Sequence, residues 1–435
     1  MVREQTRRTV EGAATSEKLL RKAEQVFSRS GYHSASVSAI CREAELAHGT
    51  FYRYFDNKED IFLHIVERLE TRFTIRIDAA AQGAPTAPGR LLACYETLLS
   101  CVEEDAAVYN VFREAEFIRP EVARRFHTAI AEVIRSVVEE GVREGDLHSA
   151  NSEVVAHAIL GMALFTALRY VIWEPGSLTP SIRRVGQQVI LRGIDAHGDT
   201  TAAQFDALQA TPGRPDLQFA MPSPEGGEVT RQALLTVAER LFGEAGFYAT
   251  TIAEITYIAG VALGTFYLYF PSKVAIFDEV TRLVSRRLRH EEKAALEGCV
   301  DRRAIECIGY KIFFRWIRRH VGAYRILREA EFVGQGRVGR EHYQQLARAY
   351  AGGLARGMER GEIREHDPEA VTYALLGIAH FGGQRWVLWE NPESPAEAAL
   401  PPLWEFVLHG LTPPRSGGAA SAARPRSTKR HRATR

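Results

Sequence analysis

The chain of 435 residues is poor in the residue patterns that carry covalent or metal chemistry. Its five cysteines are odd in number and show no C-x-x-C spacing, so we expect free thiols rather than a disulfide framework or a zinc site. The sequence contains no G-x-S-x-G elbow, no H-E-x-x-H motif and no histidine or cysteine cluster with metal-ligand spacing. It therefore predicts no enzyme, no metal site and no cofactor.

Long apolar runs and a secretory signal are missing as well. No apolar stretch reaches the roughly 20 residues of a membrane span, and residues 1–15 lack the apolar core of a signal peptide. Together with the free thiols, these absences predict a cytoplasmic protein without membrane contact. The overall charge of +1 is uneven, because residues 413–435 hold seven Arg or Lys and no acid. This tail is expected to be disordered, either as a solvated terminus or as an arm that binds phosphates without sequence preference.

The strongest positive signal is an internal repeat. Gly49–Lys58 (GTFYRYFDNK) returns 215 positions later as Gly264–Lys273 (GTFYLYFPSK). Arg113–Phe117 (REAEF) recurs letter for letter as Arg328–Phe332. A period of this length is far beyond the roughly 20–50 residues of solenoid repeats. The chain is therefore two fused copies of one unit.

Hydrophobic periodicity predicts helices in both copies and no convincing strand. In Ser16–Arg29 the apolar residues fall on one helical face, and Gly31 follows where a helix stop is favoured. A short helix begins at the cap Ser36, and its counterpart begins at a capping box, Thr251 with Glu254.

A three-residue break, 45–47, then leads to another short helix that is expected to run through Tyr54. Asn57 and Ser272 are predicted N-caps of the long helices that follow. Two short helices joined by a tight turn and buttressed by longer ones form a helix-turn-helix unit.

At these motifs both copies resemble the TetR/AcrR family of bacterial regulators. The resemblance covers about residues 15–197 and 228–412, and Gly-Thr-Phe-Tyr-x-Tyr-Phe-x-x-Lys is its most specific part. It implies an all-α fold of two tandem units. Each unit would have a helix-turn-helix that places its third helix in the DNA major groove, followed by a domain that binds a small molecule and dimerises.

The predicted boundaries follow this plan. They are a first helix-turn-helix domain at 15–75, a first ligand-binding and dimerisation domain at 76–197, a Pro/Gly-rich linker at 198–227, a second helix-turn-helix domain at 228–290, a second ligand-binding and dimerisation domain at 291–412, and the basic tail at 413–435.

The candidate DNA-binding residues lie on the presumed outer face of the third helix, because Phe51 and Phe55 are spaced to hold its inner face. Arginine can pair with guanine through two hydrogen bonds, whereas tyrosine and lysine suit phosphate oxygens. The candidates are His48, Thr50, Tyr52, Arg53, Tyr54 and Lys58 in the first copy and Thr265, Tyr267, Tyr269 and Lys273 in the second.

The two copies differ at the positions that would read bases. Leu263 and Leu268 stand where the first copy has His48 and Arg53, so the third helix of the second copy carries no charged side chain. We expect it to contribute apolar and phosphate contacts, and independent DNA binding by the second copy stays open.

Ligand contacts are predicted near the repeated REAEF motif, where charged residues neighbour aromatic ones. The candidates are Phe112, Arg113, Glu116, Phe117, Arg328, Glu331 and Phe332. The alternative is a salt-bridged helix surface with Phe117 in the core. Trp173 and Trp389 are expected in dimer-type packing. The stretch 334–339 matches G-x-G-x-x-G but follows a helical segment, which argues against nucleotide binding.

Together these features predict a DNA-binding transcriptional regulator, a repressor released by an apolar or amphipathic small molecule of unknown identity. Its partners would be a double-stranded DNA operator and that effector, and we expect association with the nucleoid. One chain is expected to form an internal pseudo-dimer, since a tether raises the effective concentration of the second copy to roughly millimolar. A homodimer of tandem chains is the competing arrangement. The alternative function is a ligand-binding or scaffold protein whose second unit serves only in pairing.

Overall fold

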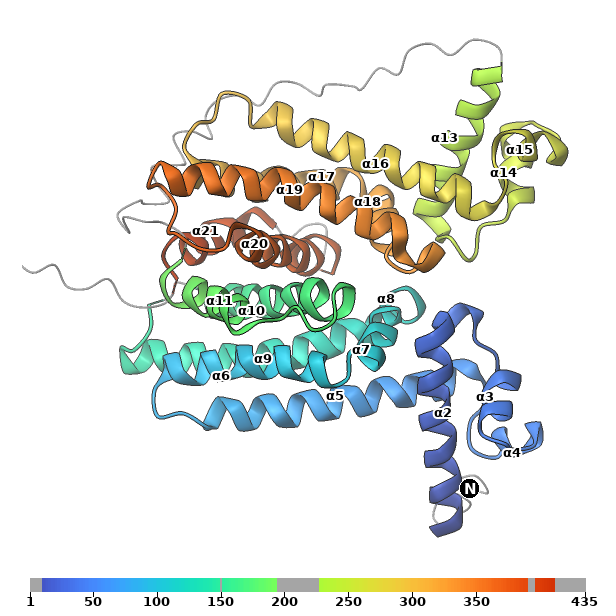
Figure 1. Ribbon diagram of the computed structural model, residues 1–435, viewed down its shortest axis with the longest axis horizontal. Helices are drawn as coiled ribbons and strands as arrows, with labels where there is room; N and C mark the ends of the chain where they lie inside the picture. Colours follow the sequence, from blue (N-terminus) through green and yellow to red (C-terminus); the bar gives the residue numbers. More distant parts are fainter. Residues whose placement is uncertain (1–9, 149–150, 194–226, 390–395, 411–435) are drawn as a thin grey trace, which may run out of the picture.

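The computed structural model describes residues 10–148, 151–193, 227–389 and 396–410, and throughout these ranges the chain forms helices without a strand (Figure 1). The predicted all-α fold is confirmed. The predicted tail at 413–435 and all but the last residue of the predicted linker lie outside the described residues.

Each unit consists of a long first helix, two short helices, a long connecting helix and a bundle. The first unit contains α2 (Val10–Ser34), α3 (Val37–Glu43), α4 (His48–Phe51), α5 (Lys58–Gln82), α6 (Ala87–Glu104), α7 (Ala106–Arg113), α8 (Ala115–Ile118), α9 (Pro120–Glu144), α10 (Ser152–Ala167), η1 (Leu168–Trp173) and α11 (Pro180–Arg192). The second contains α13 (Gly227–Ala245), α14 (Ile252–Ala259), α15 (Leu263–Tyr269), α16 (Lys273–Ala295), α17 (Arg302–Arg319), α18 (Val321–Glu329), η2 (Val333–Gly336), α19 (Arg337–Glu359), α20 (Pro368–Gly383), η3 (Gln384–Leu388), η4 (Ala396–Ala399) and α21 (Leu400–His409).

The predicted helix signals act as expected. Gly31 interrupts α2 with a φ of 73°, and the Ser36 side chain accepts a hydrogen bond from the Ala39 N–H. Both halves of the capping box at Thr251 are formed, and Asn57 and Ser272 cap α5 and α16. One expectation was wrong, because α4 ends at Phe51 rather than continuing through Tyr54.

The connecting helices α5 and α16 run from the helix-turn-helix into the bundle. The domain boundaries predicted after residues 75 and 290 therefore fall inside continuous helices. One helix therefore belongs both to the DNA-binding domain and to one wall of the bundle.

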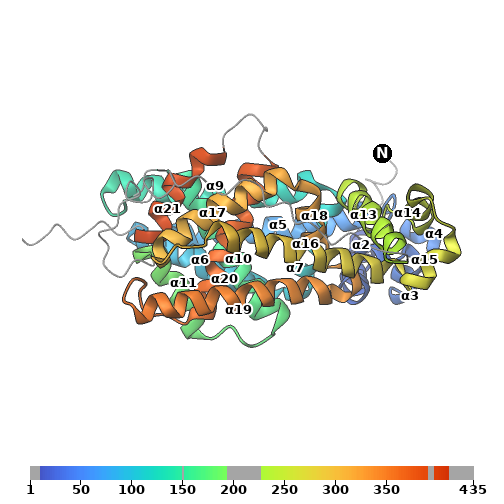
Figure 2. The same cartoon turned by 90° about the horizontal axis from the view of Figure 1, so that it is seen from above.

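The two units meet along α10 and α20, which lie side by side at the centre of the molecule (Figures 1 and 2). Gly161 and Gly377 form the crossing point. A Cβ atom added to Gly161 would lie 2.5 Å from the carbonyl oxygen of Gly377, and a Cβ atom added to Gly377 would lie even closer to the carbonyl oxygen of Gly161. Only glycine permits this approach of the two backbones. Both helix-turn-helix domains consequently lie at the same end of the molecule (Figure 2).

The segment Ser152–Trp173, which comprises α10 and η1, is more apolar than the sequence prediction allowed. Its 22 residues have the length and composition of a membrane span, but 89% of its most apolar window is buried between the other helices. Its hydrophobicity is thus explained by burial at the centre of both units.

Ion pairs and aromatic contacts repeat on either side of this crossing. Arg169 of the first unit pairs with Glu369 of the second at 2.8 Å. The equivalent residues, Arg385 of the second unit and Glu153 of the first, also form an ion pair. Trp173 packs against Tyr343 of the second unit with ring centroids 5.6 Å apart. Trp389 stacks on His127 of the first unit at 5.8 Å, so both tryptophans pack between the units as predicted.

Candidate nucleic-acid interface and effector cavity

The inner face of the first helix-turn-helix is aromatic and tightly packed. Phe51 and Phe55 are fully buried together with Ile40 and Ala44, so they hold α4 against α3 as predicted. The turn between these helices places Glu45 in the left-handed region with a φ of 53°. The second unit has Gly260 at this position, with a φ of 69°. The first unit therefore carries backbone strain that the second avoids.

The outer face of α4 holds most, but not all, of the predicted contacts. His48, Tyr52 and Arg53 are exposed, and Thr50 is half-buried. Tyr54 was expected outside, but only 4% of it is accessible, because α4 ends before it and the following turn directs it inward. We therefore remove Tyr54 from the proposed contact surface.

Lys58 and Lys273 were also predicted to face DNA, and the structure gives them another role. The Lys58 ammonium donates to the carbonyl oxygens of Tyr32, His33 and Ala35 at 2.8–3.2 Å, which uses all three of its N–H groups. Lys273 donates to two carbonyls in the matching turn of the second unit. Burial lowers the pKa of both lysines. They hold the end of the first helix rather than a phosphate.

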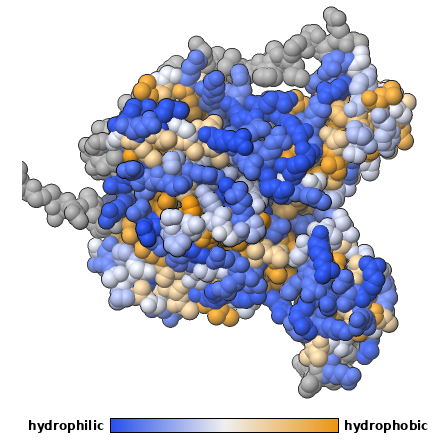
Figure 3. Space-filling model, viewed as in Figure 1, coloured by the Kyte–Doolittle hydropathy of each residue, from blue (hydrophilic) through white to orange (hydrophobic). Residues whose placement is uncertain are grey.

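The second helix-turn-helix presents a different surface. Leu263, Tyr267 and Leu268 on α15 are 52%, 55% and 81% exposed, and Tyr257 on α14 is 86% exposed. Thr265 and Tyr269 are half-buried. The single charged residue in the sequence 251–272 is Glu254, which is occupied by the capping box. Figure 3 shows the contrast, with blue over most of the lower DNA-binding domain and white and orange over much of the upper one.

The two DNA-binding domains touch each other through equivalent residues. The His33 ring stacks on Tyr248 of the second unit, with centroids 3.5 Å apart and an angle of 13° between the planes. Burial and the neighbouring Lys58 and Lys273 lower the pKa of His33 to about 4, so the ring is neutral near pH 7. This contact joins the two DNA-binding domains directly.

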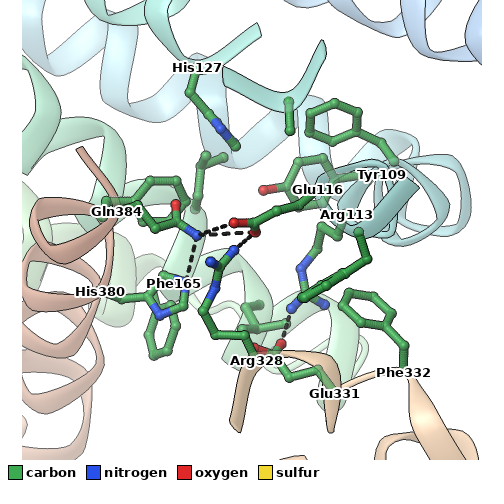
Figure 4. Close-up of a pocket in the computed structure, with 16 residues that line it drawn as sticks. Tyr109, Arg113, Glu116, His127, Phe165, Arg328, Glu331, Phe332, His380 and Gln384 are labelled. Carbon is green, nitrogen blue, oxygen red and sulfur yellow. Dashed lines mark hydrogen bonds and ion pairs between the residues drawn. The ribbon is translucent and has the colours of Figure 1, made fainter. Parts of the chain in front are cut away.

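The repeated REAEF motif pairs with itself across the two units (Figure 4). Arg113 forms an ion pair with Glu331, and Arg328 forms one with Glu116. The rings of Phe117 and Phe332 lie 5.7 Å apart. All seven predicted ligand residues line the space between them, but its volume is only about 50 Å³.

This space is well below the roughly 300 Å³ of ordinary ligand pockets. The prediction that these residues bind the effector is therefore not supported by their geometry. The buried ion pairs join the two units instead. This resembles the salt-bridged alternative, with the difference that the bridges link different copies and are buried.

The first glutamate of the motif connects the bundle to the DNA-binding domain. Both carboxylate oxygens of Glu114 lie 3.2 Å from the Tyr32 N–H, next to the Gly31 turn. Glu329 accepts from the Phe247 N–H in the same way at 2.9 Å. Burial raises the pKa of Glu114 to about 7. The four-residue stretch Arg113–Glu116 thus contacts both the partner unit and the unit's own DNA-binding domain.

A larger cavity, which the sequence did not reveal, lies inside the second unit between α16, α17, α19 and α20. Its volume is about 460 Å³, within the range of small-molecule sites. The repeat register explains the space: Phe73, Phe112 and Phe126 fill the first unit, and their counterparts are smaller. The counterparts that line the cavity are Leu288, Leu327 and His342.

A few polar groups lie among the mostly apolar residues that line this cavity. At one end Arg302 pairs with Glu306, which also accepts from the Tyr350 hydroxyl. Tyr343 and His380 belong to the wall nearest the first unit. Within the described residues, no group of three or more His, Cys, Asp or Glu side chains is arranged to hold a metal ion.

A model of the N-terminal domain of bacterial regulatory proteins of the tetR family matches the chain twice, at residues 19–65 and 234–280. The chain belongs to the TetR family. Both matches cover the helix-turn-helix just described, which confirms two tandem units.

Among curated relatives, the uncharacterised transcriptional regulator YdgC of Bacillus subtilis is 29% identical over 183 residues, 39% of this chain and 90% of YdgC. The transcriptional activator FasR of Mycolicibacterium smegmatis is 23% identical over 150 residues, 34% of this chain and 68% of FasR. The Bacillus subtilis regulator FadR, solved with stearoyl-CoA, has 20% identity and a TM-score of 0.37, covering 40% of this chain and 96% of that one. Each relative corresponds to about one unit. The chain is accordingly a DNA-binding transcriptional regulator of this family.

Proposed function

We propose that the chain is a repressor that acts as a single-chain pseudo-dimer and is released from DNA by a small molecule bound in the second unit. Pairing within one chain is supported by the Gly161–Gly377 crossing and by the reciprocal ion pairs of Arg113 and Arg328. These contacts connect equivalent positions of the two units, as the halves of a two-fold dimer are connected.

The pseudo-dimer places two unlike recognition surfaces on one DNA site. Arg53 and His48 of the first unit carry the hydrogen-bonding groups, whereas Leu263 and Leu268 of the second offer apolar contact, for example to thymine methyl groups. The operator is therefore asymmetric, with the more stringent half facing the first unit. We propose His48, Thr50, Tyr52 and Arg53 as its contacts and Thr265, Tyr267 and Tyr269 as weaker ones.

The mass of the protein on DNA tests this arrangement. At about micromolar concentration, multi-angle light scattering should give 48.6 kDa for the protein alone and one chain per duplex for its complex with operator. Two chains on one palindromic operator would contradict the pseudo-dimer. Gly161→Leu tests the crossing, because it should disrupt the internal pairing and allow two chains to associate, whereas Gly352→Leu, at a helical position where an added Cβ meets only the Arg356 side chain at 3.6 Å, should leave the mass unchanged.

The cavity of the second unit is the proposed effector site. Tyr343 in the cavity wall donates a hydrogen bond to Glu331, and Glu331 pairs with Arg113 of the first unit. The next residue, Glu114, accepts a hydrogen bond from the first DNA-binding domain. A ligand that binds more tightly to the arrangement of these contacts in the DNA-free protein than to the arrangement in the DNA-bound protein would shift the population toward the DNA-free state. Replacing Leu327 by Phe, the residue of the first unit, should narrow the cavity and weaken the response to effector while keeping operator affinity within about twofold.

A second candidate function rests on the uncharged surface of α14 and α15. In that case the second unit serves only in pairing and in sensing, and the first unit alone binds DNA. Leu268→Asp distinguishes the two, because a charge on a contact surface should weaken operator binding about tenfold, whereas a surface remote from DNA should tolerate it. The matched change Val300→Asp lies outside both helix-turn-helix domains, at a position that is 72% exposed and lines neither cavity, and it controls for the effect of an added charge.

A further inference from the structure

A cluster of arginines lines a second, smaller cavity beside the proposed effector site. Arg282, Arg286 and Arg289 are spaced by four and three residues on α16, so they share one face of that helix. They line a space of about 170 Å³ against α19, together with Ser285, His342 and a single acidic residue, Glu341. This space has an excess of positive charge.

Two of the three arginines have no acidic partner. Arg282 pairs with Glu341 at 3.2 Å. Among the residues that the structure describes, Arg286 and Arg289 form no ion pair, and the side chain of Arg289 donates to the Ser285 hydroxyl. Burial and the charge of Arg286 lower the pKa of Arg289, while Glu292 and Glu341 act in the opposite direction. An anion placed between these two guanidinium groups would be stabilised by charge-assisted hydrogen bonds.

The basic space adjoins the apolar cavity. Arg289 and His342 line both, and the His342 Nδ1 lies 2.7 Å from the Ser285 hydroxyl oxygen. Burial lowers the pKa of His342 to about 3, so this ring is neutral and available as a hydrogen-bonding group. A ligand whose apolar part lies among Leu288, Leu327 and Leu346 would direct a polar end toward Arg289.

Two acids of the walls, Glu292 and Glu341, act on Arg289, and Glu341 is already paired with Arg282. Glu292 lines the apolar cavity. Burial raises its pKa to about 7, although Arg289 acts in the opposite direction. Much of its population is therefore neutral near pH 7, and its repulsion of an incoming anion is reduced.

The first unit has the opposite chemistry at these positions. In the repeat register, Arg282, Ser285 and Arg289 correspond to Glu67, Glu70 and Thr74. Its core is filled by the three phenylalanines described above, and Arg125 pairs with Glu70 at 2.8 Å. The apolar cavity with a basic mouth is thus a property of the second unit.

We propose that Arg286 and Arg289 bind the anionic head group of an amphipathic effector, a carboxylate or a phosphate, whose apolar chain occupies the 460 Å³ cavity of the second unit. This proposal rests on the assignment of that cavity as the effector site. It narrows the ligand from any apolar small molecule to one that carries negative charge at one end.

Three probes with the same alkyl chain test the head group on the full-length protein: dodecanoate, dodecyl phosphate and dodecanol. Calorimetry should give dissociation constants for the two anions at least about tenfold lower than for dodecanol, a difference of about 1.4 kcal/mol. In the double variant Arg286→Ala/Arg289→Ala this preference should disappear, while dodecanol binds within about twofold of wild type. Whichever anion binds more tightly identifies the head group as carboxylate or phosphate.

The control variant is Arg318→Ala, an exposed arginine on α17 that lines neither cavity, and it should keep the preference. Equal affinity of wild type for all three probes, or an unchanged preference in the double variant, overturns the head-group proposal. Failure of the effector site itself has a different signature. In that case the probes either do not bind at all, or bind equally well after Leu327→Phe narrows the cavity.

Discussion

The hydroxyl group of Tyr343 donates a hydrogen bond of 3.1 Å to Glu331, and the same carboxylate pairs with Arg113 of the other unit. The wall of the large cavity is thereby one side chain away from the interface between the units. Each of these groups is buried or nearly so, which makes the arrangement sensitive to the loss of any member.

Removal of one partner of this pair should be costly. Arg113→Met leaves the Glu331 charge buried without its partner, and we expect the free energy of unfolding to fall by about 3–5 kcal/mol. The double variant Arg113→Met/Glu331→Leu should recover most of that loss, as measured by a double-mutant cycle in urea. Arg315→Met provides the matched control, because the Arg315–Glu397 pair is about half exposed and should contribute no more than about 1 kcal/mol. Equal costs for the two single variants would contradict the structural role of Arg113.

DNA binding should separate Arg53 from Lys58. Arg53→Ala is expected to weaken operator binding by about 1–3 kcal/mol and to relax the preference at one base position. Lys58→Met should instead destabilise the fold, because it leaves the carbonyls of Tyr32, His33 and Ala35 without their donor. Operator titrations at several salt concentrations, together with urea unfolding, distinguish the two. A lowered salt slope for folded Lys58→Met would return this lysine to the phosphate contacts.

Relief of backbone strain in the first turn should stabilise the protein. Glu45 has a φ of 53°, a conformation that costs a non-glycine residue about 1–2 kcal/mol. Part of that gain is lost to the greater unfolded-state entropy of glycine, so Glu45→Gly should raise the free energy of unfolding by up to about 1 kcal/mol. The reciprocal change Gly260→Ala in the second unit should lower it. If Glu45→Gly destabilises the protein, the side chain of Glu45 has a role that outweighs the strain.

Stability should depend on pH through Glu114. Its folded-state pKa of about 7 lies above the ordinary value of 4.5, so the folded protein binds this proton more tightly than the unfolded chain. The resulting stabilisation is complete below about pH 4.5 and is lost as the pH rises through about 7. The Tyr32 N–H and the charges of Arg113 and Lys58 face this carboxyl and partly oppose the shift.

The variant Glu114→Gln removes this titration. Its stability relative to wild type should rise by about 1–3 kcal/mol between about pH 5 and pH 8, as measured by urea unfolding. Glu121→Gln, at an exposed position, should show a constant difference over the same range. A constant difference for Glu114→Gln as well would mean that this carboxyl titrates normally in the folded protein.

Local signals predicted much of the fold from the sequence. The caps at Ser36, Thr251 and Asn57 and the stop at Gly31 act within one turn of the chain, so residue identity alone identifies them. Tyr54 was misplaced because α4 ends before it, and helical periodicity beyond a helix end says nothing about direction.

The partner contacts of Lys58 and the large cavity depend on residues far apart in the chain. Lys58 meets carbonyls 23 to 26 positions away, a separation that periodicity does not address. The cavity arises where three phenylalanines of one copy become smaller in the other. Comparison of the two copies in register contains that signal, at Phe73 with Leu288 and at Phe112 with Leu327. This signal predicts a cavity only once it is known that these positions lie in the same core.

The stack of His33 on Tyr248 lies between the two units, where each residue faces the position equivalent to its own. In a dimer of identical chains, any such residue contacts the same residue of the partner chain, and every mutation there therefore changes both sides of the contact at once. A duplicated and fused gene escapes that restriction, since each side of the axis is encoded separately. Unlike partners can then be selected one at a time, and the two halves are free to divide sensing and DNA reading between them.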